Sequence, residues 1–192
     1  MNEDPFKSKQ ERSSVRIEVA TPRYWKEFKK LRLEAVTGRD AKMFGVNVNT
    51  PEKLAQEVGR TDLQWQEELV LKDKFTILAW AGKEAIGMGR AERFEKLGVW
   101  YMFAGYVRPE FRGGLGKKIF AKRLKEIIKQ GGGIVRMRSK TYNSVSIGLA
   151  ESFGFSKKFE DTSDDEVVME LRDLKSPEVV KKIEEVLNTK LI

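Results

Sequence analysis

The stretch from Val107 to Phe120, VRPEFRGGLGKKIF, is the feature that most limits how this chain can fold. It joins an apolar run of strand character, residues 99–107, directly to a helical pattern that starts at Gly114. The three glycines at this junction leave backbone amides uncovered at the start of the helix, where the helix dipole is positive. The junction therefore predicts a binding site for an anion such as a phosphate. A tight turn in a basic loop is the alternative interpretation.

Two familiar phosphate-binding motifs do not fit this stretch. A P-loop needs glycine at position 111 and serine or threonine at position 118, where this chain has Phe111 and Lys118. A dinucleotide-binding fingerprint that starts at Gly114 needs glycine at position 119, which is Ile119.

Strand and helix patterns alternate along the chain, which predicts an α+β domain. The predicted strands cover residues 15–20, 75–80, 85–94, 99–107, 134–139 and 166–171. The predicted helices cover residues 21–36, 51–58, 61–69, 114–130 and 143–153, and a last one runs from 176 to the C-terminus. Thr21 is expected to cap the first helix, and Thr61 and Gln64 form a capping-box pattern.

The length of 192 residues fits one domain with terminal additions. Residues 1–14 are polar and lack apolar periodicity, which predicts a disordered arm. We expect residues 15–172 to form the domain and residues 173–192 to form an amphipathic helix appended to it. The apolar face of that helix needs a partner surface. It either folds back on the domain or forms a homodimer.

The chain contains no cysteine and no histidine. Thiolate nucleophiles, histidine-based triads and ordinary zinc sites are therefore excluded, and we expect no metal. The chain has no apolar run of the roughly 20 residues that span a bilayer, and its N-terminus lacks the apolar core of a signal peptide. We expect a soluble, cytoplasmic protein without a membrane partner.

The balance of 37 Lys and Arg against 29 Asp and Glu gives a net charge of +8, which favours anionic partners. A nucleic-acid-binding module is one hypothesis that this charge raises. The basic residues are dispersed, however, and the sequence holds no nucleic-acid-binding motif, so we expect no nucleic-acid partner.

Two motifs carry a resemblance to a known family. Residues 107–117, VRPEFRGGLGK, resemble the acetyl-CoA signature of the GNAT superfamily of N-acetyltransferases, and residues 143–155, NSVSIGLAESFGF, resemble its downstream motif. The similarity extends more loosely from the first strand through Leu171. It implies a mixed, mainly antiparallel central sheet flanked by helices, which splays between strand 99–107 and strand 134–139.

The resemblance also implies acetyl-CoA as the co-substrate. It assigns the pantetheine arm to Tyr106 and Val107 and a polar contact to Asn143. It assigns the pyrophosphate to backbone amides of Arg112, Gly113, Gly114, Leu115, Gly116 and Lys117. A strand bulge near residues 104–106 would leave one N–H group aimed at the thioester oxygen as it becomes an oxyanion.

The chain departs from the family pattern in two places. Its glycine loop is one residue shorter, and Ala150 stands where the family has the tyrosine that protonates the leaving thiolate. Ser146 and Tyr142 are candidates to position a proton or a water, although packing alone would also explain a small residue at 146. On the acceptor side, Glu92 is the candidate general base.

These observations favour an N-acetyltransferase that acts on a small primary amine by direct attack on the thioester. Acetylation of a protein N-terminus or a lysine is the alternative within enzymes, and a CoA-binding sensor without turnover is the alternative from another class. We expect the acceptor beside the first helix and the loop of residues 37–50. Four side chains of this region could surround a cationic acceptor: Glu34, Asp40, Phe44 and Asn47.

Overall fold

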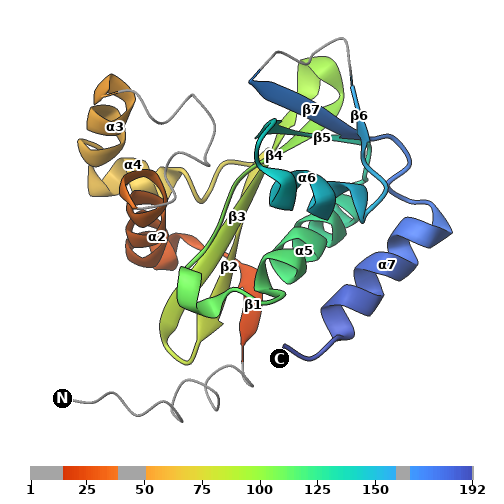
Figure 1. Ribbon diagram of the computed structural model, residues 1–192. Coiled ribbons are helices and arrows are strands. Elements are labelled where there is room, and N and C mark those ends of the chain that lie inside the picture. The colour runs from red at the N-terminus through yellow and green to blue at the C-terminus, as the bar shows by residue number, and fades with distance from the viewer. Residues whose placement is uncertain (1–14, 39–50, 159–164, 192) are drawn as a thin grey trace.

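The computed structural model describes residues 15–38, 51–158 and 165–191. The predicted arm of residues 1–14, and residues 39–50 of the predicted loop, lie outside this range. The described strands form one seven-stranded sheet in the order β1-β2-β3-β4-β5-β7-β6 (Figure 1). They are β1 (Arg16–Val19), β2 (Lys74–Ala81), β3 (Glu84–Phe94), β4 (Val99–Val107), β5 (Ile134–Lys140), β6 (Ser156–Lys157) and β7 (Glu166–Leu171).

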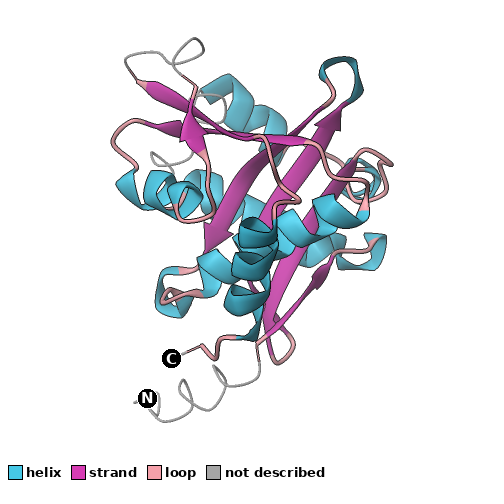
Figure 2. Ribbon diagram, turned by 90° about the vertical axis from the view of Figure 1, so that its right-hand side faces the viewer, coloured by secondary structure: helices cyan, strands magenta, loops and turns pink. Residues whose placement is uncertain are grey.

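Helices cover both faces of the sheet. The α-helices are α2 (Trp25–Thr37), α3 (Pro51–Val58), α4 (Asp62–Glu67), α5 (Leu115–Lys129), α6 (Ser144–Glu151) and α7 (Pro177–Asn188). The helices α2 to α4 lie on one side of the central strands, and α5 and α7 lie on the other (Figures 1 and 2). Neighbouring strands pair antiparallel except β4 and β5, which are parallel. The predicted mixed, mainly antiparallel α+β fold is confirmed.

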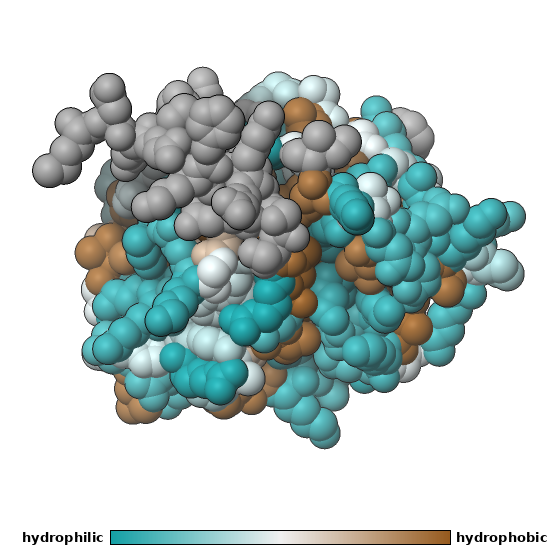
Figure 3. Space-filling model, turned by 90° about the horizontal axis from the view of Figure 1, so that it is seen from below, coloured by the Kyte–Doolittle hydropathy of each residue, from teal (hydrophilic) through white to brown (hydrophobic). Residues whose placement is uncertain are grey.

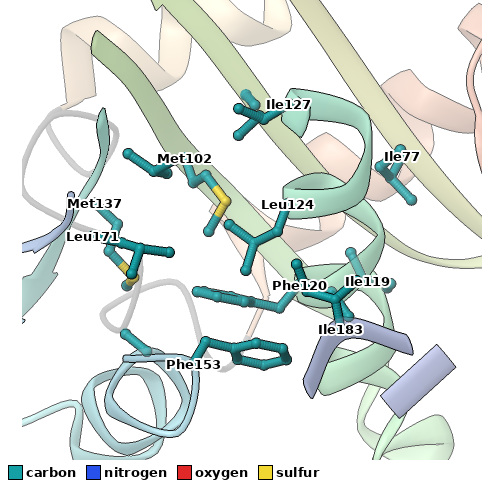
Figure 4. Packing of buried hydrophobic residues seen from close by; sticks show 14 of the residues in the cluster. Ile77, Met102, Ile119, Phe120, Leu124, Ile127, Met137, Phe153, Leu171 and Ile183 are labelled. Atoms are coloured by element: carbon teal, nitrogen blue, oxygen red, sulfur yellow. The ribbon is translucent and has the colours of Figure 1, made fainter. Parts of the chain in front are cut away.

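Two hydrophobic clusters hold these layers together. The larger one lies between the sheet and α5, α6 and α7, where the rings of Phe120 and Phe153 stack with centroids 5.1 Å apart (Figure 4). The smaller one lies between the sheet and α2 and α4, around the fully buried Phe28 and Trp65. Burial of such large rings contributes roughly 2 to 3 kcal/mol each to folding. The sheet is therefore fixed from both sides.

Capping differs between two predicted helix starts. Thr61 and Gln64 form the expected capping box at α4. Thr21 is at the expected N-cap position, with Pro22 in the first turn, but its side chain forms no capping hydrogen bond. Pro22–Tyr24 form a 3-10 turn first, and the Thr21 carbonyl accepts a hydrogen bond from the Tyr24 amide at 2.9 Å. A backbone bond thus closes the turn.

The C-terminal helix α7 folds back on α5. Its Ile183 is 1% exposed, and Glu184 pairs with Lys125 on α5 at 2.8 Å. The ammonium group of Lys118 donates to the Leu187 carbonyl at 3.1 Å, at the last turn of α7. Much of the apolar face of α7 is therefore covered within one chain. In the described part of the chain, no helix is long and apolar enough to cross a membrane.

Hydrophilic residues dominate the surface that is seen from below in Figure 3, and a narrow strip of hydrophobic residues runs through the middle of this face. The strip is flanked by hydrophilic side chains on both sides.

Candidate active site

The parallel strands β4 and β5 separate halfway along β4. They pair from Val99 with Ile134 to Met102 with Met137, and β4 then continues to Val107 beyond the last of these pairs. A cavity of about 980 Å³ occupies this region, and residues of β4, β5, α5 and α6 line it. The structure therefore has the splay that the sequence predicted.

A bulge in β4 faces this cavity. Met88 of β3 pairs with Tyr106, whereas Arg90 pairs with Phe103, so that two residues of β4 lie opposite one residue of β3. One of the two, Ala104, has a left-handed backbone with φ of 50°. A non-glycine residue rarely adopts this conformation, and such strain is typical of functional sites. The bulge lies where the sequence predicted it, between residues 104 and 106.

The glycine loop forms one end of the cavity. Gly113 and Gly114 have φ values of 111° and 102°, which other residues rarely adopt, and Gly114 is the N-cap of α5. Glycine has no side chain to cap the helix, so the N-cap residue leaves the first amides of α5 without a side-chain acceptor of its own. The Arg112 guanidinium donates to the Val107 carbonyl at 3.3 Å. The loop residues that line the cavity are Val107, Arg112 and Gly116.

The other predicted loop residues, Gly113, Gly114, Leu115 and Lys117, lie in the same turn outside the cavity lining. The Leu115 side chain is 1% exposed and packs in the larger core cluster. For this residue, only the backbone is left to act on a ligand.

The helix α6 brings Asn143 and Ser146 to the cavity. The Asn143 side-chain oxygen accepts a hydrogen bond from the Ser146 amide at 3.1 Å and so caps α6. Ala150 has no exposed surface and belongs to the core cluster instead of the cavity lining. Of the two positions one turn apart, only 146 faces the cavity.

Tyr106 lines the cavity on the α2 side of the sheet and packs against the smaller core cluster. Burial, followed by the negative charge of Glu34, raises the pKa of its hydroxyl group. The phenol is therefore neutral at physiological pH.

Glu92 also lines the cavity, but at a distance from Tyr106. It lies opposite Tyr101 in the ladder and forms an ion pair with Lys74 at 3.0 Å. Tyr101 and Tyr106 are five residues apart on one strand, which corresponds to about 15 Å. The structure brings Glu92 and Tyr106 into one cavity without bringing them together.

The sequence did not reveal the ion pairs that border the cavity near α3. Arg32, Glu57 and Arg60 line it, with Glu57 3.2 Å from Arg32 and 3.6 Å from Arg60. Arg60 is also 3.3 Å from Glu68, which in turn pairs with Arg90. Glu57 and Arg60 are three residues apart, but Arg32, Glu68 and Arg90 come from other elements, so no local sequence pattern indicated the network as a whole.

The acceptor mouth that was predicted for a cation is only partly described. Glu34 does not line the cavity, because its two oxygens accept hydrogen bonds from Arg108 at 2.8 Å each. Asp40, Phe44 and Asn47 lie outside the described residues.

Arg123 on α5 lines the cavity as well and was not among the site residues expected from the sequence. A signal was available, because Arg123 stands between Ile119 and Ile127 on the mainly apolar face of the helix.

A splayed pair of parallel strands, with a glycine loop and a helix N-terminus at one end of the gap, forms a cavity with backbone amides for an anion at that end. Comparisons with known proteins identify the family. The model of the acetyltransferase (GNAT) family matches residues 43–155. The match covers more than half of the chain, and the chain belongs to the GNAT acetyltransferase family. No curated protein sequence matches it significantly.

Solved structures share the fold at low sequence identity. The PaiA N-acetyltransferase of Thermoplasma acidophilum, in complex with coenzyme A, is 20% identical, with a TM-score of 0.60 over 83% of this chain and 99% of that one. The putative acetyltransferase yncA of Salmonella typhimurium, with acetyl-CoA, is 18% identical, with a TM-score of 0.62 over 85% and 96%. The ribosomal-protein-S18-alanine N-acetyltransferase of Escherichia coli is 14% identical, with a TM-score of 0.57 over 83% and 94%.

Among the residues that the structure describes, no group of three or more Asp and Glu side chains could hold a metal ion.

Proposed function

We propose that the chain is an N-acetyltransferase that moves the acetyl group of acetyl-CoA to the primary amine of a small molecule. The observation that carries this proposal is the gap between β4 and β5, which extends from the glycine loop to the bulge. Family membership supports acyl transfer, and the Thermoplasma and Salmonella proteins hold coenzyme A or acetyl-CoA in a fold of this kind. Residues 15–172 would be the catalytic domain, with α7 appended to it.

The glycine loop would bind the pyrophosphate. The backbone amides from Arg112 to Lys117 lie around the N-terminus of α5. There, the helix dipole and the basic side chains of Arg112 and Lys117 favour an anion. The pantetheine arm would then follow β4 and form hydrogen bonds with the exposed strand edge at Tyr106 and Val107. Because the Asn143 side-chain oxygen already caps α6, this residue would offer the ligand its amide nitrogen.

The amine attacks the thioester directly. Its nitrogen forms a C–N bond with the thioester carbon, while the carbonyl oxygen takes the electron pair, and a tetrahedral intermediate results. Collapse of this intermediate breaks the C–S bond and releases the CoA thiolate, and the nitrogen gives up one proton. Backbone N–H groups at the bulge next to Ala104 would stabilise the oxyanion.

Tyr106 would supply the proton to the leaving thiolate, since its raised pKa keeps the phenol protonated. Ser146, on α6, would orient a water in the same cavity. Glu92 lies about 15 Å along the strand from Tyr106, so it would take the amine proton only through intervening waters.

One observation supports each of two other functions. The fold is shared with an enzyme whose name specifies an alanine of a protein as its acceptor, the ribosomal-protein-S18-alanine N-acetyltransferase. A sensor that binds CoA without turnover is supported by Ala150, which leaves the cavity without the tyrosine of the family motif.

The test combines calorimetric titration of the protein with acetyl-CoA and a thiol-release assay over aliphatic amines, amino acids and peptides with free N-termini or lysines. Binding with thiol release and a mass increase of the small amine supports the proposal. Release with peptides alone favours a protein acceptor, and binding without release favours the sensor. If acetyl-CoA does not bind, the assignment of the glycine loop is wrong.

A further inference from the structure

Arg123 is a charged residue on the buried face of α5 that no part of the mechanism above uses. Arg123 is 6% exposed and lies on the apolar stripe that also contains Ile119 and Ile127. A guanidinium group is costly to bury, and a residue of this kind is usually paired with a carboxylate. Among the described residues, no Asp or Glu forms an ion pair with Arg123.

The guanidinium group lies against the bulge in β4. Its Nη1 atom donates to the carbonyl of Arg90 on β3 at 3.3 Å and to the carbonyl of Phe103 on β4 at 3.4 Å. These two residues form the last regular pair before the bulge. Arg123 therefore bridges the two strands at the point where their ladder is irregular.

Two glycines make room for this side chain. A Cβ atom at Gly89 would lie 2.9 Å from the Arg123 Nε atom, and a Cβ atom at Gly105 would lie 3.5 Å from Nη2. The Nε atom is buried without a hydrogen-bond partner. The ring of Phe120 lies below the group, with its centroid 5.2 Å from the guanidinium carbon. The sheet thus leaves space for the Arg123 guanidinium group, and none of its described side chains neutralises the charge.

Arg123 also lies on the path of the proposed ligand. Successive turns of α5 bring Gly116, Ile119, Phe120 and Arg123 to the cavity wall. Gly116 belongs to the loop that would hold the pyrophosphate, and seven residues of helix correspond to about 10 Å. A pantetheine arm that leaves the loop along this face therefore reaches the level of Arg123 and the bulge at its thioester end.

We propose that Arg123 is a positioning residue for acetyl transfer. It fixes the carbonyls beside the bulge and so directs the bulge N–H groups, and it places an uncompensated positive charge behind the thioester oxygen. This charge favours the electron pair that moves to the oxygen during attack and then to the departing sulfur; Arg123 itself gives up no proton. The inference rests on the proposed function, and it explains how transfer proceeds with alanine at position 150.

The charge is present at physiological pH. Burial lowers the pKa of Arg123 to about 10, so the group remains protonated at neutral pH. On its own helix, Glu126 is held by Lys122 at 2.8 Å and by Lys129 at 3.1 Å. On β3, the side chain of Arg90 lies over the Phe28 ring of α2 and pairs with Glu68.

The carboxylates that share the cavity with Arg123 form ion pairs with other basic residues, and Glu57 pairs with Arg32 at 3.2 Å. Glu92 pairs with Lys74 at 3.0 Å. Glu166 lies 3.6 Å from both Arg138 and Lys140.

The first experiment compares Arg123→Met with Lys129→Met, which removes a charge from an exposed position of the same helix. We expect Arg123→Met to lower kcat by about 10- to 100-fold, with KM and the calorimetric Kd for acetyl-CoA changed by less than about 3-fold. The thermal midpoint stays the same or rises, because methionine fills the space without a buried charge. Lys129→Met keeps the kcat of the original protein. A joint loss of stability, binding and kcat in Arg123→Met would show a structural role and overturn the proposal.

The second experiment uses Arg123→Lys to separate charge from shape. A buried lysine has a lowered pKa, so its charge is present at low pH and is lost as pH rises through that pKa. The ratio of kcat in Arg123→Lys to kcat in the original protein should therefore fall with rising pH, while the same ratio for Arg123→Met stays flat. Taking the ratio cancels the deprotonation of the acceptor amine. Flat ratios for both variants would contradict a role for the charge.

A third measurement needs no acceptor. Infrared spectroscopy of bound acetyl-CoA, isotope-labelled at the thioester carbonyl, reports how strongly that bond is polarised. We expect the carbonyl band at a lower frequency in the original protein than in Arg123→Met. Equal frequencies would overturn the role of Arg123 while leaving the proposed function intact. Failure of the original protein to bind acetyl-CoA would instead overturn the proposed function, and this inference with it.

Discussion

Single residues show which parts of the site a sequence can reveal. Gly113 and Gly114 mark a backbone that other residues rarely adopt, so the loop was predictable from residue type alone. The ion pairs of Arg32 and Glu57 were not, because each partner comes from a different helix. Arg123 falls between these cases: its position on an apolar stripe was visible, but its contact with the bulge depends on the packed sheet.

Gly114 provides a direct test of the anion site. We expect Gly114→Glu to weaken acetyl-CoA binding by about 100-fold or more, because it adds a negative charge and a strained backbone where the pyrophosphate would lie. Calorimetric titration measures the change. Gly82→Glu is the matched control, since Gly82 also has a positive φ, of 57°, and a Cβ atom there meets nothing within 4 Å. Equal affinities in the two variants would place the phosphates elsewhere.

At the level of elements, periodicity and capping residues were sufficient for most of the described helices and strands. The turn between β2 and β3 contains Gly82, and Gly131 follows the end of α5; both glycines have a positive φ. The strand β6 was missed because its two residues, Ser156 and Lys157, are too few to show an alternating pattern. Its pairing with β7 is a tertiary contact that local sequence does not encode.

The packing of α7 on α5 predicts a specific loss of stability. We expect Ile183→Ala to lower the free energy of unfolding by about 2 to 4 kcal/mol, because the side chain is 1% exposed and its removal leaves a cavity. Val180→Ala on the same helix should cost less than about 1 kcal/mol, since Val180 is 36% exposed. Urea unfolding measures both. Equal costs would show that α7 does not pack this way in solution.

The pairing of β5 with β7 predicts a dependence of stability on pH. Glu170 is 4% exposed; burial raises its pKa, but hydrogen bonds from Arg136 at 2.6 Å and Arg172 at 2.7 Å outweigh burial and lower it overall. A lowered folded-state pKa stabilises the fold above the unfolded value of about 4.3, and this stabilisation is lost as pH falls through the folded-state pKa.

Glu170→Gln should therefore cost about 1 to 3 kcal/mol at pH 7, with a smaller difference from the original protein at pH 3. Urea unfolding at several pH values gives both numbers. Glu185→Gln, at an exposed position of α7, should show no such trend. A constant difference for Glu170→Gln across this range would contradict the assigned shift.

The molecule as a whole carries a charge of +8, and its cavity includes Arg112, Arg123 and Arg138. Under the proposed function, acetyl-CoA at 100 times its Kd should stabilise the protein by about 2.7 kcal/mol, or roughly 5 to 10 °C in thermal midpoint. Raising the salt concentration should weaken this binding several-fold, because part of the attraction to the phosphates is screened. An affinity that does not change with salt would show that backbone amides alone supply the binding.

The short ladder between β4 and β5 divides the sheet into β1 to β4 and β5 to β7, joined directly by the four pairs that end at Met102 and Met137. Units with few shared hydrogen bonds open separately, so amide hydrogen exchange should reveal two units of different protection. A ligand that binds β4 beyond Met102 and also contacts α6 would connect these units. We therefore expect bound acetyl-CoA to slow amide exchange in both halves of the sheet, including amides that it does not touch. The two units would then open together and no longer separately.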